Sequence, residues 1–138
     1  MTDQERLIDS TLPLIKQLLE TYSEFFPLAS AIKSDDSIAQ VGTYDGDKKP
    51  LSQKVILELK NGFKALKDKY KSIAIFYDVC VVDPNTELKT DAVAIFTETR
   101  NENSAYIFYY PYVLTNDNQI TFLPNHWNDI NNREIFVD

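Results

Sequence analysis

Apolar residues recur every three or four positions in two segments of the chain, and this is the period of an amphipathic helix. In the first segment they are Ile8, Leu12, Ile15, Leu19, Tyr22 and Phe26. In the second segment, which Ser52 can cap, they are Val55, Leu59, Phe63, Leu66 and Tyr70. Each segment therefore predicts a helix with one apolar face that packs against another element.

The start of the first helix has two interpretations. Thr2 and Glu5 fit a capping box, so the helix can begin at Asp3. Pro13 is unfavourable inside a helix, because it lacks an N–H and clashes with the previous turn. Either the helix kinks at Pro13, or it starts near Ser10 or Thr11, which places Pro13 in the first turn, where proline is tolerated. We favour this later start for the part of the helix that packs.

Around and after these helices, alternating apolar residues and turn formers predict five strands. They span residues 28–33, 37–44, 72–82, 88–98 and 104–112. The first two form a hairpin and the last three form a meander, whereas the irregular C-terminal segment from Val113 onward combines a weak strand at residues 120–123 with an Asn-rich stretch. We predict one α+β domain over residues 1–138 with two main helices and an antiparallel five-stranded sheet, in the order helix, hairpin, helix, three-stranded meander.

The strand over residues 72–82 is apolar at both odd and even positions, apart from Asp78. Such a strand needs cover on both faces. We therefore expect Cys80, the only cysteine of the chain, to be buried and unreactive.

The order of elements resembles that of profilin-like and roadblock-like domains over residues 3–112. In such a sheet the edges fall to residues 37–44 or 72–82, and exposed apolar edges template unwanted pairing. The resemblance implies that the C-terminal tail, or a second copy of the chain in a homodimer, covers the strand over residues 72–82.

Four short stretches also resemble a family of small uncharacterised bacterial proteins. They are Phe26-Pro27-Leu28-Ala29, Tyr44-Asp45-Gly46-Asp47, Phe76-Tyr77-Asp78-Val79 and Lys89-Thr90-Asp91-Ala92. This resemblance supports the predicted fold and implies no particular activity.

Composition and charge narrow the classes of partner. The chain is 43% hydrophobic and 25% charged, as in ordinary globular proteins. Its net charge of −7 argues against binding to nucleic acids or anionic membranes, which are polyanions. No apolar run is long enough to span a membrane and the N-terminus lacks a signal-peptide pattern, so we expect a cytoplasmic protein.

Positive charge gathers in one part of this acidic chain. Residues 48–71 contain eight lysines against two acids. Four of the lysines repeat beside the apolar face of the second helix, namely Lys60, Lys64, Lys67 and Lys71. Together with the acidic remainder, this stripe is a candidate surface for an oriented encounter with a charged partner.

Three residues are candidates for a polar site. Asp78 and Asp91 fall in strands that otherwise read as buried, where a carboxylate needs a partner or a shifted pKa. His126, with Asp129 nearby, can be a general base. The alternative is structural: the acids pair with lysines or backbone amides, and His126 is a loop residue.

An aromatic strand is the second candidate surface. Tyr106, Phe108, Tyr110 and Tyr112 alternate along residues 104–112 and so share one face. They form either part of the core or a surface for a partner, because tyrosine suits places where one end of the ring is apolar and the other wet.

Neither a metal nor a cofactor is expected. Asp45-Gly46-Asp47 resembles a cation-binding loop, but Lys48, Lys49 and Pro50 stand where further oxygen ligands would be needed, so a turn is favoured. With only three glycines, the chain has no phosphate-binding loop.

These observations favour a non-catalytic module that acts by protein interaction or regulation, similar to immunity proteins or roadblock scaffolds, and binds another protein or itself. The alternative is a small enzyme or ligand-binding domain that uses Asp78, Asp91 or His126. No catalytic motif supports the alternative.

Overall fold

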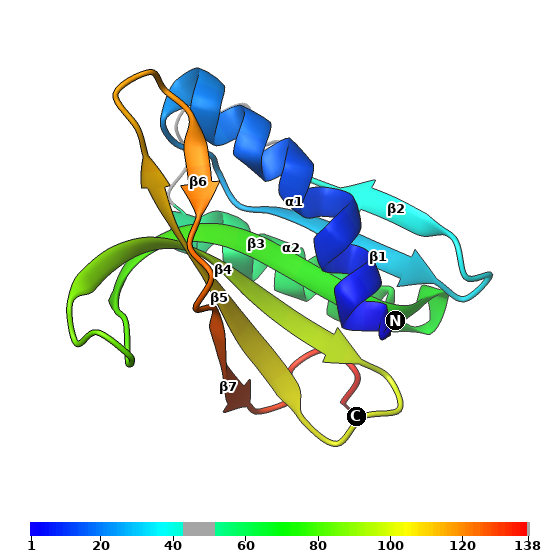
Figure 1. Cartoon of the computed structure of the whole chain (residues 1–138). Helices are drawn as coiled ribbons and strands as arrows, with labels where there is room; N and C mark the ends of the chain where they lie inside the picture. Colours follow the sequence, from blue (N-terminus) through cyan, green and yellow to red (C-terminus); the bar gives the residue numbers. More distant parts are fainter. Residues whose placement is uncertain (43–51, 138) are drawn as a thin grey trace.

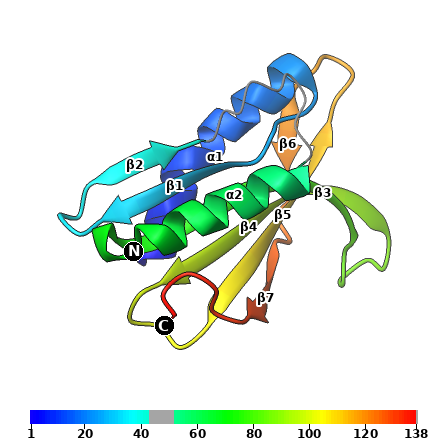
Figure 2. The same ribbon diagram turned by 180° about the vertical axis from the view of Figure 1, so that it is seen from behind.

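The computed structural model describes residues 1–42 and 52–137. Two helices, α1 (Asp3–Tyr22) and α2 (Ser52–Ala65), lie on opposite faces of one curled antiparallel sheet (Figures 1 and 2). A short 3-10 helix, Lys67–Lys69, leads from α2 into the sheet. The strands are β1 (Leu28–Lys33), β2 (Ile38–Val41), β3 (Tyr70–Val82), β4 (Lys89–Thr99), β5 (Ala105–Leu114), β6 (Ile120–Phe122) and β7 (Trp127–Asn131).

The predicted five-stranded sheet with a three-stranded meander is wrong. The sheet has seven strands in the order β2-β1-β3-β4-β5-β6, and β7 also pairs with β5, so that the sheet curls into a half-barrel. The two additional strands come from the C-terminal region: β6 lies at the weak strand predicted over residues 120–123, whereas β7 lies in the stretch predicted to be irregular. β6 has only three residues and β7 is mostly polar, so the side-chain pattern marks both weakly. Backbone pairing with β5 holds them in place.

β6 and β7 run along the same edge of β5 but are out of step with each other. Tyr112 pairs with Phe122, whereas Tyr109 pairs with Trp127. The chain that connects the β6 pairing to the β7 pairing therefore contains two more residues than the stretch of β5 beside it. Such a bulge re-aims the side chains next to it, and here it lies immediately before β7.

Helix α1 begins at Asp3, so the later start that we favoured is wrong. The Thr2 hydroxyl accepts a hydrogen bond from the Glu5 N–H at 3.1 Å and caps the helix. The helix continues through Pro13, whose side chain is exposed. Burial of the apolar face on both sides of Pro13 offsets the local cost of the proline.

The two helices give the sheet two apolar layers. Ala74 and Phe76 of β3 pack on the α1 side, and Ile73 and Ile75 pack on the α2 side. β3 lies between β1 and β4 rather than at an edge. β1 pairs with β3 along residues 70–76, so the expectation that this part of the strand over residues 72–82 forms a sheet edge is wrong. The homodimer stays a prediction.

The far ends of β3 and β4 extend beyond both helices as a two-stranded ribbon (Figure 1). Cys80 lies in this ribbon and is exposed, so the prediction of a buried thiol is wrong. The apolar pattern of β3 continues further than the helices that cover it, and the pattern itself does not reveal where cover ends.

The C-terminal residues pack on the α2 side of the sheet. Ile135 and Phe136 are buried there. The fully buried carboxylate of Glu98 on β4 accepts hydrogen bonds from the N–H groups of Glu134, Ile135 and Phe136. The tail thus docks beside α2 through one carboxylate and successive backbone amides.

Neither described helix is long and apolar enough to cross a membrane.

Candidate functional site

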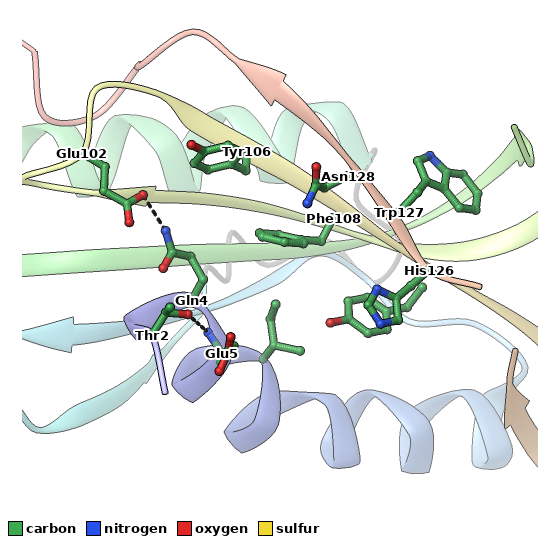
Figure 3. A pocket seen from close by; sticks show the side chains of 11 residues that line it. Thr2, Gln4, Glu5, Glu102, Tyr106, Phe108, His126, Trp127 and Asn128 are labelled. Atoms are coloured by element: carbon green, nitrogen blue, oxygen red, sulfur yellow. Dashed lines mark hydrogen bonds between the residues drawn. The ribbon is translucent and has the colours of Figure 1, made fainter. Parts of the chain in front are cut away.

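An open groove of about 510 Å³ lies on the α1 face of the sheet, where the first turns of α1 stand beside β5 and β7 (Figure 3). It is lined by Thr2, Gln4, Glu5, Ile8, Glu102, Tyr106, Phe108, Tyr110, His126, Trp127 and Asn128. The groove brings together residues from both ends of the sequence.

Aromatic side chains of β5 form the floor of the groove. Tyr106, Phe108 and Tyr110 alternate along the strand and point to its α1 face, and each is half-buried. The Tyr106 and Phe108 ring centroids lie 6.3 Å apart. α1 packs chiefly on β1, β3, β4 and β6, so this part of β5 is only half-buried.

The fourth member of the predicted aromatic row has a different role. Tyr112 is only 6% exposed and packs in the core beneath α1, with its ring edge against Phe122. The aromatic strand is therefore core at Tyr112 and lines the groove at Tyr106 and Tyr110, and its role as a surface for a partner stays a prediction.

His126 joins the groove through the bulge before β7. Its ring stacks on Tyr110 with a centroid distance of 4.8 Å and an interplanar angle of 19°. Trp127 points away and stacks on Tyr109 on the other face of β5. No described carboxylate accepts a hydrogen bond from His126, and this includes Asp129, the acid expected to orient it. His126 thus lies in the groove as an exposed, stacked ring.

Two acids give the groove a negative rim. Glu102 Oε2 accepts a hydrogen bond of 2.7 Å from Gln4 Nε2, which joins the β4–β5 loop to α1 (Figure 3). The Glu5 carboxylate is exposed on the first turn of α1. Burial raises the pKa of Tyr110, and the negative charges of Asp9 and Glu5 raise it further. Among the described lining residues there is no lysine or arginine.

Asp78 and Asp91 lie outside the groove. The Tyr112 hydroxyl donates a 2.7 Å hydrogen bond to Asp78 Oδ1. Burial is the main cause that raises the pKa of Asp78; the Tyr112 hydrogen bond opposes this shift and the charge of Asp91 adds to it. Asp91 is exposed and pairs in register with Tyr112. The structure thus brings Asp78, Asp91 and Tyr112 together and leaves His126 apart from them, stacked on Tyr110.

The predicted lysine stripe is divided between several contacts. Its members are Lys60, Lys64, Lys67 and Lys71. Lys60 pairs with Glu134 at 3.0 Å, and Lys67 donates to the main-chain carbonyl of Val137, so both hold the C-terminal segment. Lys71 pairs with Asp36 in the β1–β2 turn, whereas Lys64 is exposed. The stripe therefore serves largely to join parts of the same chain.

Sequence reasoning missed Gln4, Glu102 and Glu98, which join segments far apart along the chain. Nothing in the local pattern marks them, since a charged loop and a polar strand end are ordinary. The predicted turn at Asp45-Gly46-Asp47 lies outside the described residues. Within the described part, no group of three or more His, Cys, Asp or Glu side chains could hold a metal ion.

Comparison of the chain with models of protein families, with curated proteins and with solved structures finds no match. A function can therefore be argued only from the geometry of the groove and its surroundings.

Proposed function

We propose that this protein is a non-catalytic interaction module that binds a partner protein through the aromatic groove. The observation that carries the proposal is the row of half-buried rings, Tyr106, Phe108 and Tyr110, with His126 stacked against it in an open groove. Aromatic residues are enriched at the centres of protein interfaces, where they supply much buried area with few rotatable bonds.

The alternative of a small enzyme has less support. Its three candidate residues do not line one groove, because Asp78 and Asp91 lie around Tyr112 while His126 stacks on Tyr110. Catalysis by a nucleophile and a base needs both within hydrogen-bond reach. Among the described residues of the groove, no side chain makes a hydrogen bond with His126 that would form such a pair.

The groove can be tested by placing a photo-crosslinking amino acid in the full chain, at Tyr106 in one variant and at Leu57 in another. Leu57 lies on α2 and is 58% exposed, so it controls for general surface contact. A partner crosslinked at position 106 is identified, purified and titrated by calorimetry. If the chain pairs with itself, the crosslinked product is a dimer.

We expect the purified partner to bind Tyr106→Ala at least about tenfold more weakly than the wild type, as for a typical interface hot spot. Leu57→Ala should bind as the wild type does. Equal affinity for the Tyr106→Ala variant, or a partner that crosslinks only from position 57, would show that the groove is not the binding surface.

A further inference from the structure

We infer that the groove recognises an arginine side chain within an extended basic segment of the partner protein, its guanidinium held between the aromatic floor and the carboxylates of Glu5 and Glu102. This inference rests on the proposed function and adds the chemistry of the partner. Three features of the groove support it: its charge, its ring faces and its polar groups.

The described lining residues of the groove include two carboxylates and no lysine or arginine. None of the described residues donates a hydrogen bond to the Glu5 carboxylate or forms an ion pair with it. Glu102 accepts only the one hydrogen bond from Gln4. Arg6, the arginine of α1, binds Asp36 at 2.9 Å instead. A cationic side chain that enters the groove would therefore meet two carboxylates with free acceptor sites.

The same position on α1 could suggest an anion, because the N-terminus of a helix attracts negative charge. Here the first turn already carries Asp3 and Glu5. The N–H of Glu5 is also occupied by the Thr2 hydroxyl. An anion would thus meet two like charges and a capped helix end, so a cation is favoured.

The aromatic floor favours arginine among the cations. A guanidinium stacks on ring faces and still presents N–H donors in its plane, which an ammonium does less well. The half-buried Tyr110 ring carries the stacked His126 on one side.

The remaining space and polar groups favour a peptide over a free cation. A groove of about 510 Å³ lies within the size range of sites that hold whole ligands rather than one functional group. The Asn128 side chain is exposed on the wall formed by β7, with no hydrogen bond to the described chain. It can bind the main chain of an extended segment on either side of the arginine.

Fluorescence anisotropy with labelled peptides tests the inference. The probe is Gly-Ser-Arg-Gly-Arg-Ser-Gly, and its matched control replaces each arginine by citrulline, which is neutral and of similar shape. Free arginine amide serves as a competitor. Amide NMR spectra of the full chain, including the side-chain amides of Gln4 and Asn128, locate the bound peptide.

We expect the arginine peptide to bind about tenfold or more tightly than the citrulline peptide, as lost charge-assisted hydrogen bonds imply. Glu5→Gln and Glu102→Gln should each weaken binding severalfold. Glu87→Gln is the matched control, because it removes one negative charge from an exposed turn at the other end of β4. It should leave the affinity unchanged, and shifted NMR signals should cluster at the groove.

Four results would overturn the inference. Equal binding of the arginine and citrulline peptides at the groove would refute the charge argument and leave the proposed function intact. Equal weakening by Glu87→Gln, with signals shifted across the surface, would show general attraction to an acidic protein. Arginine amide as tight as the peptide would indicate a small-cation site. Failure of the arginine peptide to bind, while a partner crosslinks from position 106, would refute the inference that the partner presents a basic segment and would leave the proposed function intact.

Discussion

Glu98→Gln is expected to loosen the C-terminal segment and to destabilise the whole domain. The Glu98 carboxylate is 0% exposed. The N–H groups of Glu134 and Phe136 donate to its two oxygens at 2.6 Å each, and the N–H of Ile135 lies 3.1 Å from both. Successive backbone amides converging on one anion form a nest. Glutamine has the same shape as glutamate, but it would place an NH₂ group against backbone N–H donors that need an acceptor.

The size of the effect follows from what glutamine leaves unsatisfied. A hydrogen bond to a charged group contributes about 1.5–3 kcal/mol, and breaking a buried charge pair costs about 3–5 kcal/mol. The Arg133 Nε atom lies 3.8 Å from Glu98 Oε2, so its charge also loses a partner. Since one amide oxygen still accepts, we expect a loss of about 2–4 kcal/mol in the free energy of unfolding. For a domain of this size, this loss lowers the midpoint temperature of thermal unfolding by about 10 °C.

Urea denaturation measures the global effect, and hydrogen exchange of the Ile135 and Phe136 amides measures the local one. We expect these amides to exchange roughly a hundredfold faster in the variant, since each 1.4 kcal/mol is a factor of about ten. Glu134→Gln is the matched control: its carboxylate belongs to the same segment, but its side chain is 40% exposed and pairs with Lys60. Exposed pairs of this kind contribute about 0–1 kcal/mol.

A free energy of unfolding within about 0.5 kcal/mol of the wild type, with unchanged exchange at Ile135, would refute this reasoning. The tail would then be held by the burial of Ile135 and Phe136 alone. A chain that ends at Asn132 separates the two contributions, because it removes the apolar contacts and the amide donors together. It should be less stable than Glu98→Gln.

Three further outcomes are expected. Cys80 should react with a thiol reagent in the native protein nearly as fast as in urea, because it is exposed, and strong native protection would contradict this. Pro13→Ala should raise the free energy of unfolding by about 1–3 kcal/mol, because Pro13 is exposed within a continuous helix. A free energy of unfolding that does not rise in urea denaturation would contradict this. The raised pKa of Asp78, caused mainly by burial, means that its protonated form is favoured in the folded state. The stability that Asp78 contributes is then present below its unfolded pKa of about 4 and is lost as the pH rises through the higher folded pKa. Over that pH range the free energy of unfolding of Asp78→Asn should therefore increase relative to that of the wild type. Parallel pH profiles of the two proteins would contradict this.

Much of the core could be anticipated from single segments. The spacing of Ile8, Ile15 and Leu19 marks the buried face of α1, and that of Val55, Leu59 and Phe63 marks the buried face of α2. Such predictions succeed because the side chains on one face of a helix are set by the period of the helix itself.

The candidate site was only partly anticipated. Tyr106, Tyr110 and His126 were singled out and do line one groove. Their acidic neighbours were not, because Glu5 and Glu102 lie far apart along the chain and come together only where α1 crosses the sheet. The same holds for Glu98, whose donors lie in the C-terminal segment.

The sequence by itself determined which faces of the helices are apolar and that β3 needs cover on both sides, since these properties depend on neighbours one to four positions apart. Only the tertiary structure decided that β1 rather than a tail lies beside β3, that β6 and β7 extend the sheet, and that Cys80 lies beyond the cover of the helices. Strand pairing uses backbone groups that every residue carries, so side-chain pattern alone does not select the partner strand.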